Sequence, residues 1–94
     1  MNPVSMLCIP RMESCFKLDY VISKIVNLKI GTIESIKEIP LKNEPNHKRI
    51  IMQIRWNEEP NTENIKTRLN KNDSIKIVYD DKWYWKLLLA KFTE

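Results

Sequence analysis

The sequence predicts an α+β domain in which two helices cover one face of a four-stranded antiparallel sheet. Its 94 residues are enough for one small domain with one core. Apolar residues make up 43% of the chain and charged residues 30%, which is the balance of a globular protein. Four segments have the composition or alternation of strands, and two have the periodicity of helices.

The chain starts with a short apolar run that is followed by a helical pattern. Residues 4–9 are predicted to form a strand, because the run is short and Pro10 follows it. The apolar residues of the next segment fall on one helical stripe: Val21, Ile22, Ile25, Val26 and Leu28. We expect Asp19 to be the N-cap and Gly31 to be the left-handed residue that ends this helix.

Two strands are expected in the middle of the chain. Three isoleucines lie at intervals of three, which suits a helix or a strand: Ile33, Ile36 and Ile39. Their β-branched side chains and the Pro40 that follows favour a strand, with a bulge near Ser35 or Ile36 to reconcile the spacing. Residues 48–56 alternate between apolar and polar side chains, which predicts a strand with one buried face.

The second half of the chain supplies a helix, a strand and a tail. Asn61 or Thr62 is expected to cap a surface helix that ends near Asn70. Residues 75–79 are predicted to form the fourth strand, and residues 82–94 an aromatic and apolar tail. The domain of residues 1–94 would then have a β-α-β-β-α-β core over residues 4–81. This is the ferredoxin-like plan, in which both helices share one face and the other face stays open.

This plan resembles the RNA-recognition motif (RRM), whose two signature strands correspond to residues 7–12 and 49–56. Over nearly its whole length the chain is also similar to uncharacterised RRM-like proteins of large nucleocytoplasmic DNA viruses. The segments that carry this similarity are Cys8-Ile9-Pro10-Arg11, residues 28–31, residues 48–51, Arg55-Trp56 and residues 75–86. In the last segment Lys82 stands where these proteins usually have proline. The resemblance implies an RRM-like fold and a viral source, and it implies no activity.

The chain departs from the RRM pattern where that family stacks bases. Arg49 matches the basic first position of the signature, and Trp56 matches its buried aromatic position. The stacking positions fall on Cys8, Ile51 and Gln53, none of which is aromatic. Since stacking on an aromatic ring contributes about 1–3 kcal/mol per base, we do not expect RRM-like reading of single-stranded RNA.

A basic sheet face is the first candidate site. Sixteen Lys and Arg against twelve Asp and Glu give a formal net charge of +4, a mild preference for anionic partners. The candidate nucleic-acid contacts are Arg11, Arg49, Ile51, Gln53, Arg55, Lys76 and Lys86. A solvated basic face that only keeps the sheet soluble is the alternative interpretation.

The aromatic segment Trp83-Tyr84-Trp85 is the second candidate site. Two alternatives are open: both indoles close the end of a small core, or one is exposed as an anchor for a partner. A third alternative has the tail folding back over the sheet and blocking it. The residues proposed as partner anchors are Trp83, Tyr84 and Trp85.

Several classes of function are not expected. One glycine excludes a glycine-rich phosphate loop, and one histidine with two cysteines supplies too few ligands for a structural zinc site. No serine has a histidine or acid at the spacing of a known catalytic motif. We therefore expect no enzyme activity, no cofactor and no metal. No apolar run reaches the ~18 residues of a membrane span, so we expect an intracellular protein, in the cytoplasm of an infected cell or in the virion.

The expected function is that of a non-catalytic, RRM-like binding module. A protein–protein interaction domain is slightly favoured, because aliphatic and polar sheet faces suit protein contact better than bases. Its partner would be a viral or host protein. The alternative is a weak, electrostatic binder of RNA or single-stranded DNA through the basic sheet face.

Overall fold

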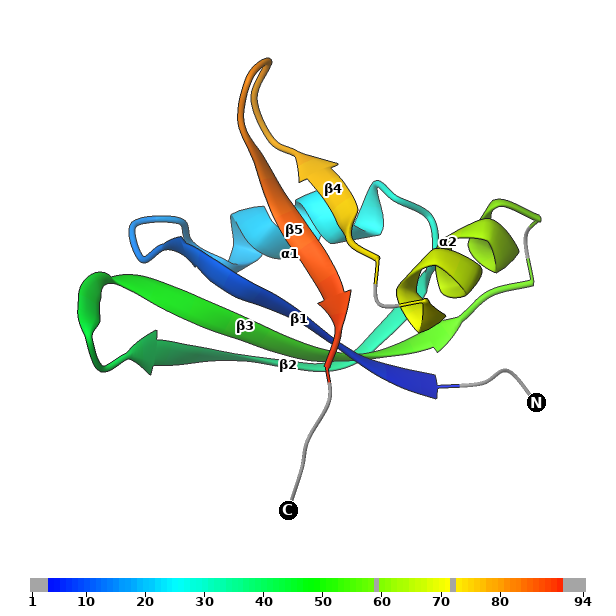
Figure 1. Ribbon diagram of the computed structural model, residues 1–94, viewed down its shortest axis with the longest axis horizontal. Helices are drawn as coiled ribbons and strands as arrows, with labels where there is room; N and C mark the ends of the chain where they lie inside the picture. The colour runs from blue at the N-terminus through cyan, green and yellow to red at the C-terminus, as the bar shows by residue number, and fades with distance from the viewer. Residues whose placement is uncertain (1–3, 59, 72, 91–94) are drawn as a thin grey trace.

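The sheet has five strands, and the fifth comes from the segment that the sequence analysis assigns to a tail. The computed structural model describes residues 4–58, 60–71 and 73–90 (Figure 1). The strands are β1 (Val4–Glu13), β2 (Gly31–Leu41), β3 (Glu44–Trp56), β4 (Ile75–Val78) and β5 (Tyr84–Leu89). The helices are α1 (Leu18–Val26), between β1 and β2, and α2 (Pro60–Asn70), between β3 and β4. The strands pair in antiparallel fashion in the order β2-β3-β1-β5-β4.

The predicted four-stranded β-α-β-β-α-β plan, ferredoxin-like or RRM-like, is therefore wrong. In that plan the strand after the second helix lies beside the first strand, whereas here β5 pairs with β1 and β4 lies outside it. A tight turn reverses the chain: the backbone N–H of Tyr79 donates to the carbonyl of Trp83 at 3.2 Å, and the Asp80 carboxylate accepts from the N–H of Asp81 at 2.8 Å. The residues matched to the RRM signature therefore do not lie in an RRM sheet in this protein.

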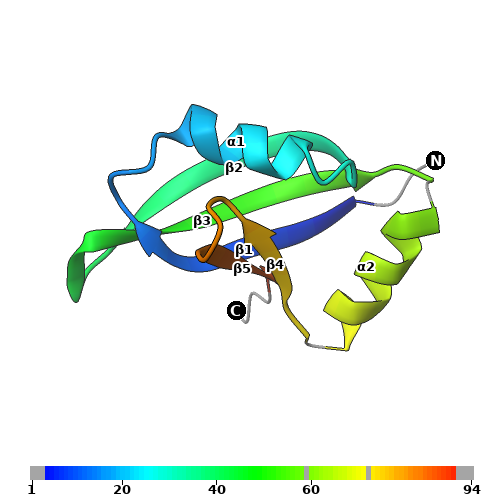
Figure 2. The ribbon, with the colours of Figure 1, turned by 90° about the horizontal axis from the view of Figure 1, so that it is seen from above.

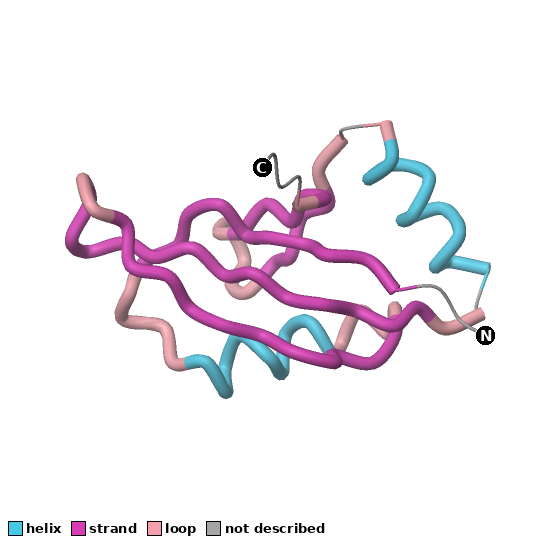
Figure 3. The backbone as a smooth tube through the Cα atoms, turned by 90° about the horizontal axis from the view of Figure 1, so that it is seen from below, coloured by secondary structure: helices cyan, strands magenta, loops and turns pink. Residues whose placement is uncertain are grey.

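One face of the sheet carries the core, and both helices pack on it. The core residues lie on alternate positions of the strands and on one side of each helix: Leu7, Ile9, Ile50, Met52, Ile54, Trp56, Ile75, Ile77, Trp85 and Leu87 from the sheet, and Val21, Ile25 and Leu69 from the helices. In Figure 2, α1 runs along the side of β2 and β3, and α2 lies beside β4. Figure 3, seen from below, looks onto the other face of the sheet, which no described helix covers.

Helix α1 is the helix that the apolar periodicity predicts, but its ends differ from the expectation. Lys17, not Asp19, is the N-cap, and Asp19 lies in the first turn, where a carboxylate interacts favourably with the helix dipole. The helix ends at Val26, and the left-handed residue that follows it is Lys29, with φ 56°. None of the helices in the described ranges is long and apolar enough to cross a membrane.

Gly31 has a role other than the expected helix end, because it is the first residue of β2. A Cβ atom at this position would lie 2.1 Å from the backbone oxygen of Arg55. The residue must therefore lack a side chain for β2 to pair closely with β3.

Two bulges, and an irregularity between Pro40 and Leu41 next to the β2–β3 turn, shift the register of the sheet. The bulge of β2 lies at Glu34, one residue from the predicted position, and it lets Ile33 and Ile36 both pack against the core. In β1, residues Ile9 and Met12 both point into the core, and the register shifts between them. Strand β1 thus continues beyond the proline where the sequence analysis ends it.

Candidate functional site

The uncovered face of the sheet, here called the open face, carries a short apolar strip across its centre. Cys8 of β1 is the register partner of Ile51 in β3 and of Leu88 in β5. Ile51 is only 8% exposed although no helix covers it, because these neighbours surround it. Two of the positions that correspond to RRM stacking positions, Cys8 and Ile51, are therefore neighbours in this strip. The third, Gln53, is half-buried next to Met6.

Three of the predicted cationic contacts already have partners. Arg11 forms an ion pair with Glu44, with Nη2 and Oε1 3.0 Å apart. Arg55 forms one with Glu34, with Nε and Oε1 2.5 Å apart. The ammonium group of Lys76 lies 4.7 Å from the centre of the Tyr84 ring, a cation–π contact.

The other two predicted cations, Arg49 and Lys86, form no ion pair within the described chain. Lys86 is also the direct register partner of Lys76 on β4. Side chains that face each other across antiparallel strands lie about 5 Å apart at Cβ, and like charges there repel. The open face therefore holds a pair of positive charges that a bound anion would stabilise.

The three neighbouring aromatic residues have different environments. Trp85 is 3% exposed, stacks on Tyr79 with 4.5 Å between ring centroids, and meets Phe16 edge-on. Trp83 is 63% exposed and Tyr84 is 41% exposed. Trp85 is thus a core residue, and only Trp83 and Tyr84 offer ring surface to a partner.

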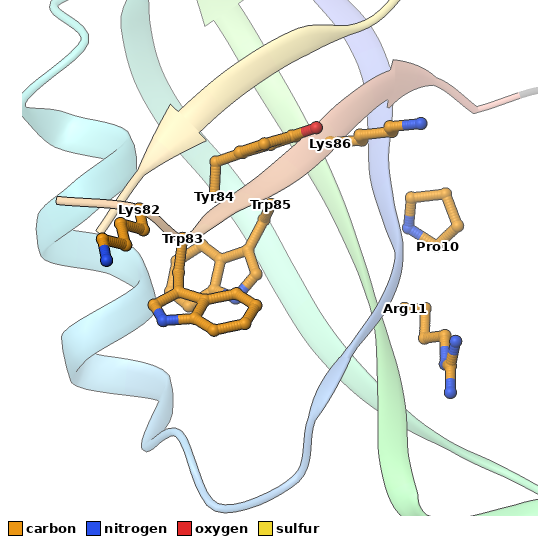
Figure 4. A pocket seen from close by; sticks show the side chains of 7 residues that line it. All are labelled: Pro10, Arg11, Lys82, Trp83, Tyr84, Trp85 and Lys86. Atoms are coloured by element: carbon orange, nitrogen blue, oxygen red, sulfur yellow. The ribbon is translucent and has the colours of Figure 1, made fainter. Parts of the chain in front are cut away.

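A hollow of about 420 Å³ lies beside the β4–β5 turn and combines aromatic and basic side chains. Figure 4 shows the two indoles at one end of it and Pro10 and Arg11 at the other. Its lining residues are Pro10, Arg11, Lys82, Trp83, Tyr84, Trp85 and Lys86.

A second hollow, of about 620 Å³, lies toward the β2–β3 turn. The two hollows share Pro10 and Arg11, and we call them together the cross-strand groove. The second is lined by Pro10, Arg11, Leu41, Lys42, Asn43, Glu44 and Arg49. Five of the side chains that line the cross-strand groove are therefore cationic, and Glu44 is the single acid among them.

The bulge of β1 builds the middle of this groove. Pro10 and Arg11 together oppose one residue of β3, Arg49, because the register shifts between Ile9 and Met12. This two-against-one arrangement leaves Ile9 and Met12 in the core and brings both intervening residues to the groove.

The groove contains residues that the sequence analysis missed. Lys82, Lys42 and Glu44 lie in or next to turns, and Pro10 lies in the bulge. Periodicity does not place such residues on a face, because turns and bulges interrupt it. The Pro10-Arg11 step within an apolar run was the one sequence signal for a bulge.

The two cysteines differ in burial, since Cys8 is half-buried and Cys15 is exposed. Burial raises the pKa of the Cys8 thiol, and the positive charge of Arg49 offsets part of that rise. The thiol is therefore neutral at pH 7 and a poor nucleophile. Both Cys8 and Cys15 are free. In residues 4–58, 60–71 and 73–90, no group of three His, Cys, Asp or Glu side chains could hold a metal ion.

Comparison with protein-family models, with curated proteins and with solved structures finds no match. The resemblance to RRM-like viral proteins thus stays a prediction, and the function has to be argued from the geometry of the open face.

Proposed function

We propose that this protein is a non-catalytic module that binds single-stranded nucleic acid in the cross-strand groove. The observation that carries the proposal is that exposed aromatic rings line the same groove as five cations, four of which form no ion pair with the described residues. Proteins that hold single strands combine these two features, because the rings stack on bases and the cations follow the phosphates. Either RNA or single-stranded DNA would satisfy both.

The aromatic end of the groove supplies the stacking surfaces that the RRM signature positions lack. Those positions are Cys8, Ile51 and Gln53, whose side chains cannot stack on bases. Strand β5 adds the ring of Tyr84 to the open face, and the exposed indole of Trp83, in the turn before β5, lines the first hollow. Each stacked base would contribute about 1–3 kcal/mol, so these two rings could replace the missing platforms.

The cations of the groove supply the second part of the argument. Lys86, Arg11 and Arg49 lie on the neighbouring strands β5, β1 and β3, and Lys86 and Arg11 both line the first hollow. These three cations therefore follow one another along the cross-strand groove. An extended chain of phosphates would neutralise them and relieve the repulsion between Lys76 and Lys86.

A protein partner, viral or host, is the second candidate, and it is the class that the sequence alone slightly favours. The β4–β5 hairpin exposes 60% of Val78 and 63% of Trp83, which is a large apolar surface at its tip. Tryptophan, tyrosine and arginine dominate the energy of protein interfaces. With either ligand, an intracellular location in the cytoplasm of an infected cell or in the virion forms part of the proposal and rests on the viral resemblance.

Fluorescence anisotropy with labelled oligouridine and oligothymidine tests the proposed function. We expect binding at ~50 mM salt that weakens at ~200 mM, with a slope of log affinity against log salt of about −0.7 for each phosphate contacted. Trp83 should change its fluorescence when a base stacks on it.

The matched variants are Arg49→Ala/Lys86→Ala and Lys17→Ala/Lys71→Ala. Both remove two positive charges, but Lys17 and Lys71 are exposed residues next to the helices and line neither hollow. We expect the first variant alone to lose binding. No binding at ~50 mM salt, or equal loss in both variants, would refute the proposal. A different result would favour a protein partner: neither oligonucleotide binds, the unmodified protein crosslinks to one defined protein, and Trp83→Ala abolishes that crosslink.

A further inference from the structure

One ion pair lies across the middle of the cross-strand groove. Arg11 lines both hollows, and Glu44, whose Oε1 is 3.0 Å from Arg11 Nη2, lines the second. We propose that Glu44 limits the affinity of the groove by competing with a ligand phosphate for Arg11. The inference rests on the proposed function and adds the residue that sets its strength.

The backbone brings these two side chains together from separate elements. Arg11 reaches the groove because of the β1 bulge. Glu44 is the first residue of β3 and pairs with Leu41 across the β2–β3 turn. A bound nucleic-acid chain that stacks on Trp83 and crosses Lys86 and Arg11 would next reach Arg49. The Glu44 carboxylate lies beside this path, in the second hollow.

The pair is weak enough for a ligand to break. The side chain of Arg11 is 59% exposed and that of Glu44 is 40% exposed. Ion pairs at such positions add little stability, and salt screens them. A guanidinium can bind a phosphate through two parallel N–H donors, so Arg11 can exchange the carboxylate for a phosphate. The displaced carboxylate then stays near the phosphate and repels it.

A second arginine–glutamate pair provides a matched control on the same face. Glu34 pairs with Arg55, and neither residue lines the cross-strand groove. Glu34→Gln and Glu44→Gln raise the net charge equally, and each releases one arginine of the open face. Only Glu44→Gln releases an arginine inside the groove.

The test compares the two variants in oligouridine titrations over a range of salt concentrations. We expect Glu44→Gln to bind about three- to tenfold more tightly at ~50 mM salt, with a slope of log affinity against log salt steeper by up to about 0.7. Glu34→Gln should stay within about twofold of the unmodified protein. Arg11→Ala/Glu44→Gln should lose the gain, because the released guanidinium is absent.

The outcomes separate this inference from the proposed function. Equal gains in Glu34→Gln and Glu44→Gln would show a general charge effect and overturn the inference while oligouridine binding persists. No gain in Glu44→Gln, or a gain that survives the loss of Arg11, would also overturn it. No binding by the unmodified protein or by Glu44→Gln would overturn both proposals.

Discussion

Lys48 and Arg49 are neighbours in the sequence, yet they belong to faces of the sheet with opposite properties. Lys48 points to the helix face, where its side chain is 7% exposed, pairs with Glu38 at 2.5 Å and donates to the carbonyl of Phe16. Arg49 points to the open face and is exposed at the groove. The cation on the helix face is part of the packing, and the cation on the open face is available to a ligand. In a strand, the side of the pleat decides which role a basic residue has.

We expect the largest difference between a packed and an exposed side chain at the two tryptophans of the β4–β5 hairpin. Trp85→Ala should destabilise the protein by about 3–5 kcal/mol, because it removes a buried ring from the core. Trp83→Ala should cost less than about 0.5 kcal/mol, since Trp83 is mostly exposed. Urea unfolding of both variants measures the difference. Equal costs would mean that Trp83 also belongs to the core and offers no ring to a base.

The cations of β3 give a smaller test. Lys48→Met should destabilise the fold by about 1–2 kcal/mol, because the Phe16 carbonyl and Glu38 lose their donor. Arg49→Met should change stability by less than about 0.5 kcal/mol and should weaken oligonucleotide binding. Denaturant unfolding and anisotropy, measured on the same two variants, should therefore rank them in opposite orders. A stable Lys48→Met protein would show that the buried pair has no structural role.

The smallest effect that we expect is a shift in the pKa of the Cys8 thiol. Its pKa is raised by burial, so the neutral thiol contributes stability that is complete below the unfolded pKa and is lost as the pH rises through the folded pKa. In a Cys15→Ser background, the rate of Cys8 alkylation by iodoacetamide should reach its midpoint above pH 9.0, the ordinary value. Arg49→Met should move that midpoint higher, because the positive charge of Arg49 lowers the pKa. An unchanged midpoint in this variant would place the Arg49 charge away from Cys8.

The sequence predicted the elements whose patterns are regular. The alternation of residues 48–56 corresponds to the second part of β3, and the apolar stripe from Val21 to Leu28 corresponds to α1. The number and order of strands were not predictable in the same way. Residues 84–87 alternate between exposed and buried positions, but three aromatic residues, a lysine and three leucines resemble a tail as much as a strand. Only pairing with β1 decides between them, and pairing is a property of the whole chain.

The candidate site was predictable in its chemistry and not in its geometry. Arg11, Arg49 and Lys86 were identified from their charge, and Trp83 and Tyr84 from their unusual clustering. Burial of Trp85 depends on contacts with Phe16 and Tyr79, which come from distant segments. Arg55 was expected to be available, but the β2 bulge brings Glu34 to it. The shape of the groove depends on a bulge and two turns, and none of these has a periodic signature.

The position of β5 constrains how the chain acquires its structure. Leu7 pairs with Leu89, so the central strand of the sheet, β1, pairs with the last described strand. The chain between Leu7 and Leu89 has to close into a long loop before this pairing contributes any stability. The entropy lost in closing that loop slows folding. On a translating ribosome, β1 and β3 could pair early, but β1 would keep one edge unsatisfied until residues 84–89 had emerged. We therefore expect the aromatic end of the cross-strand groove to form only after residues 84–89 have emerged.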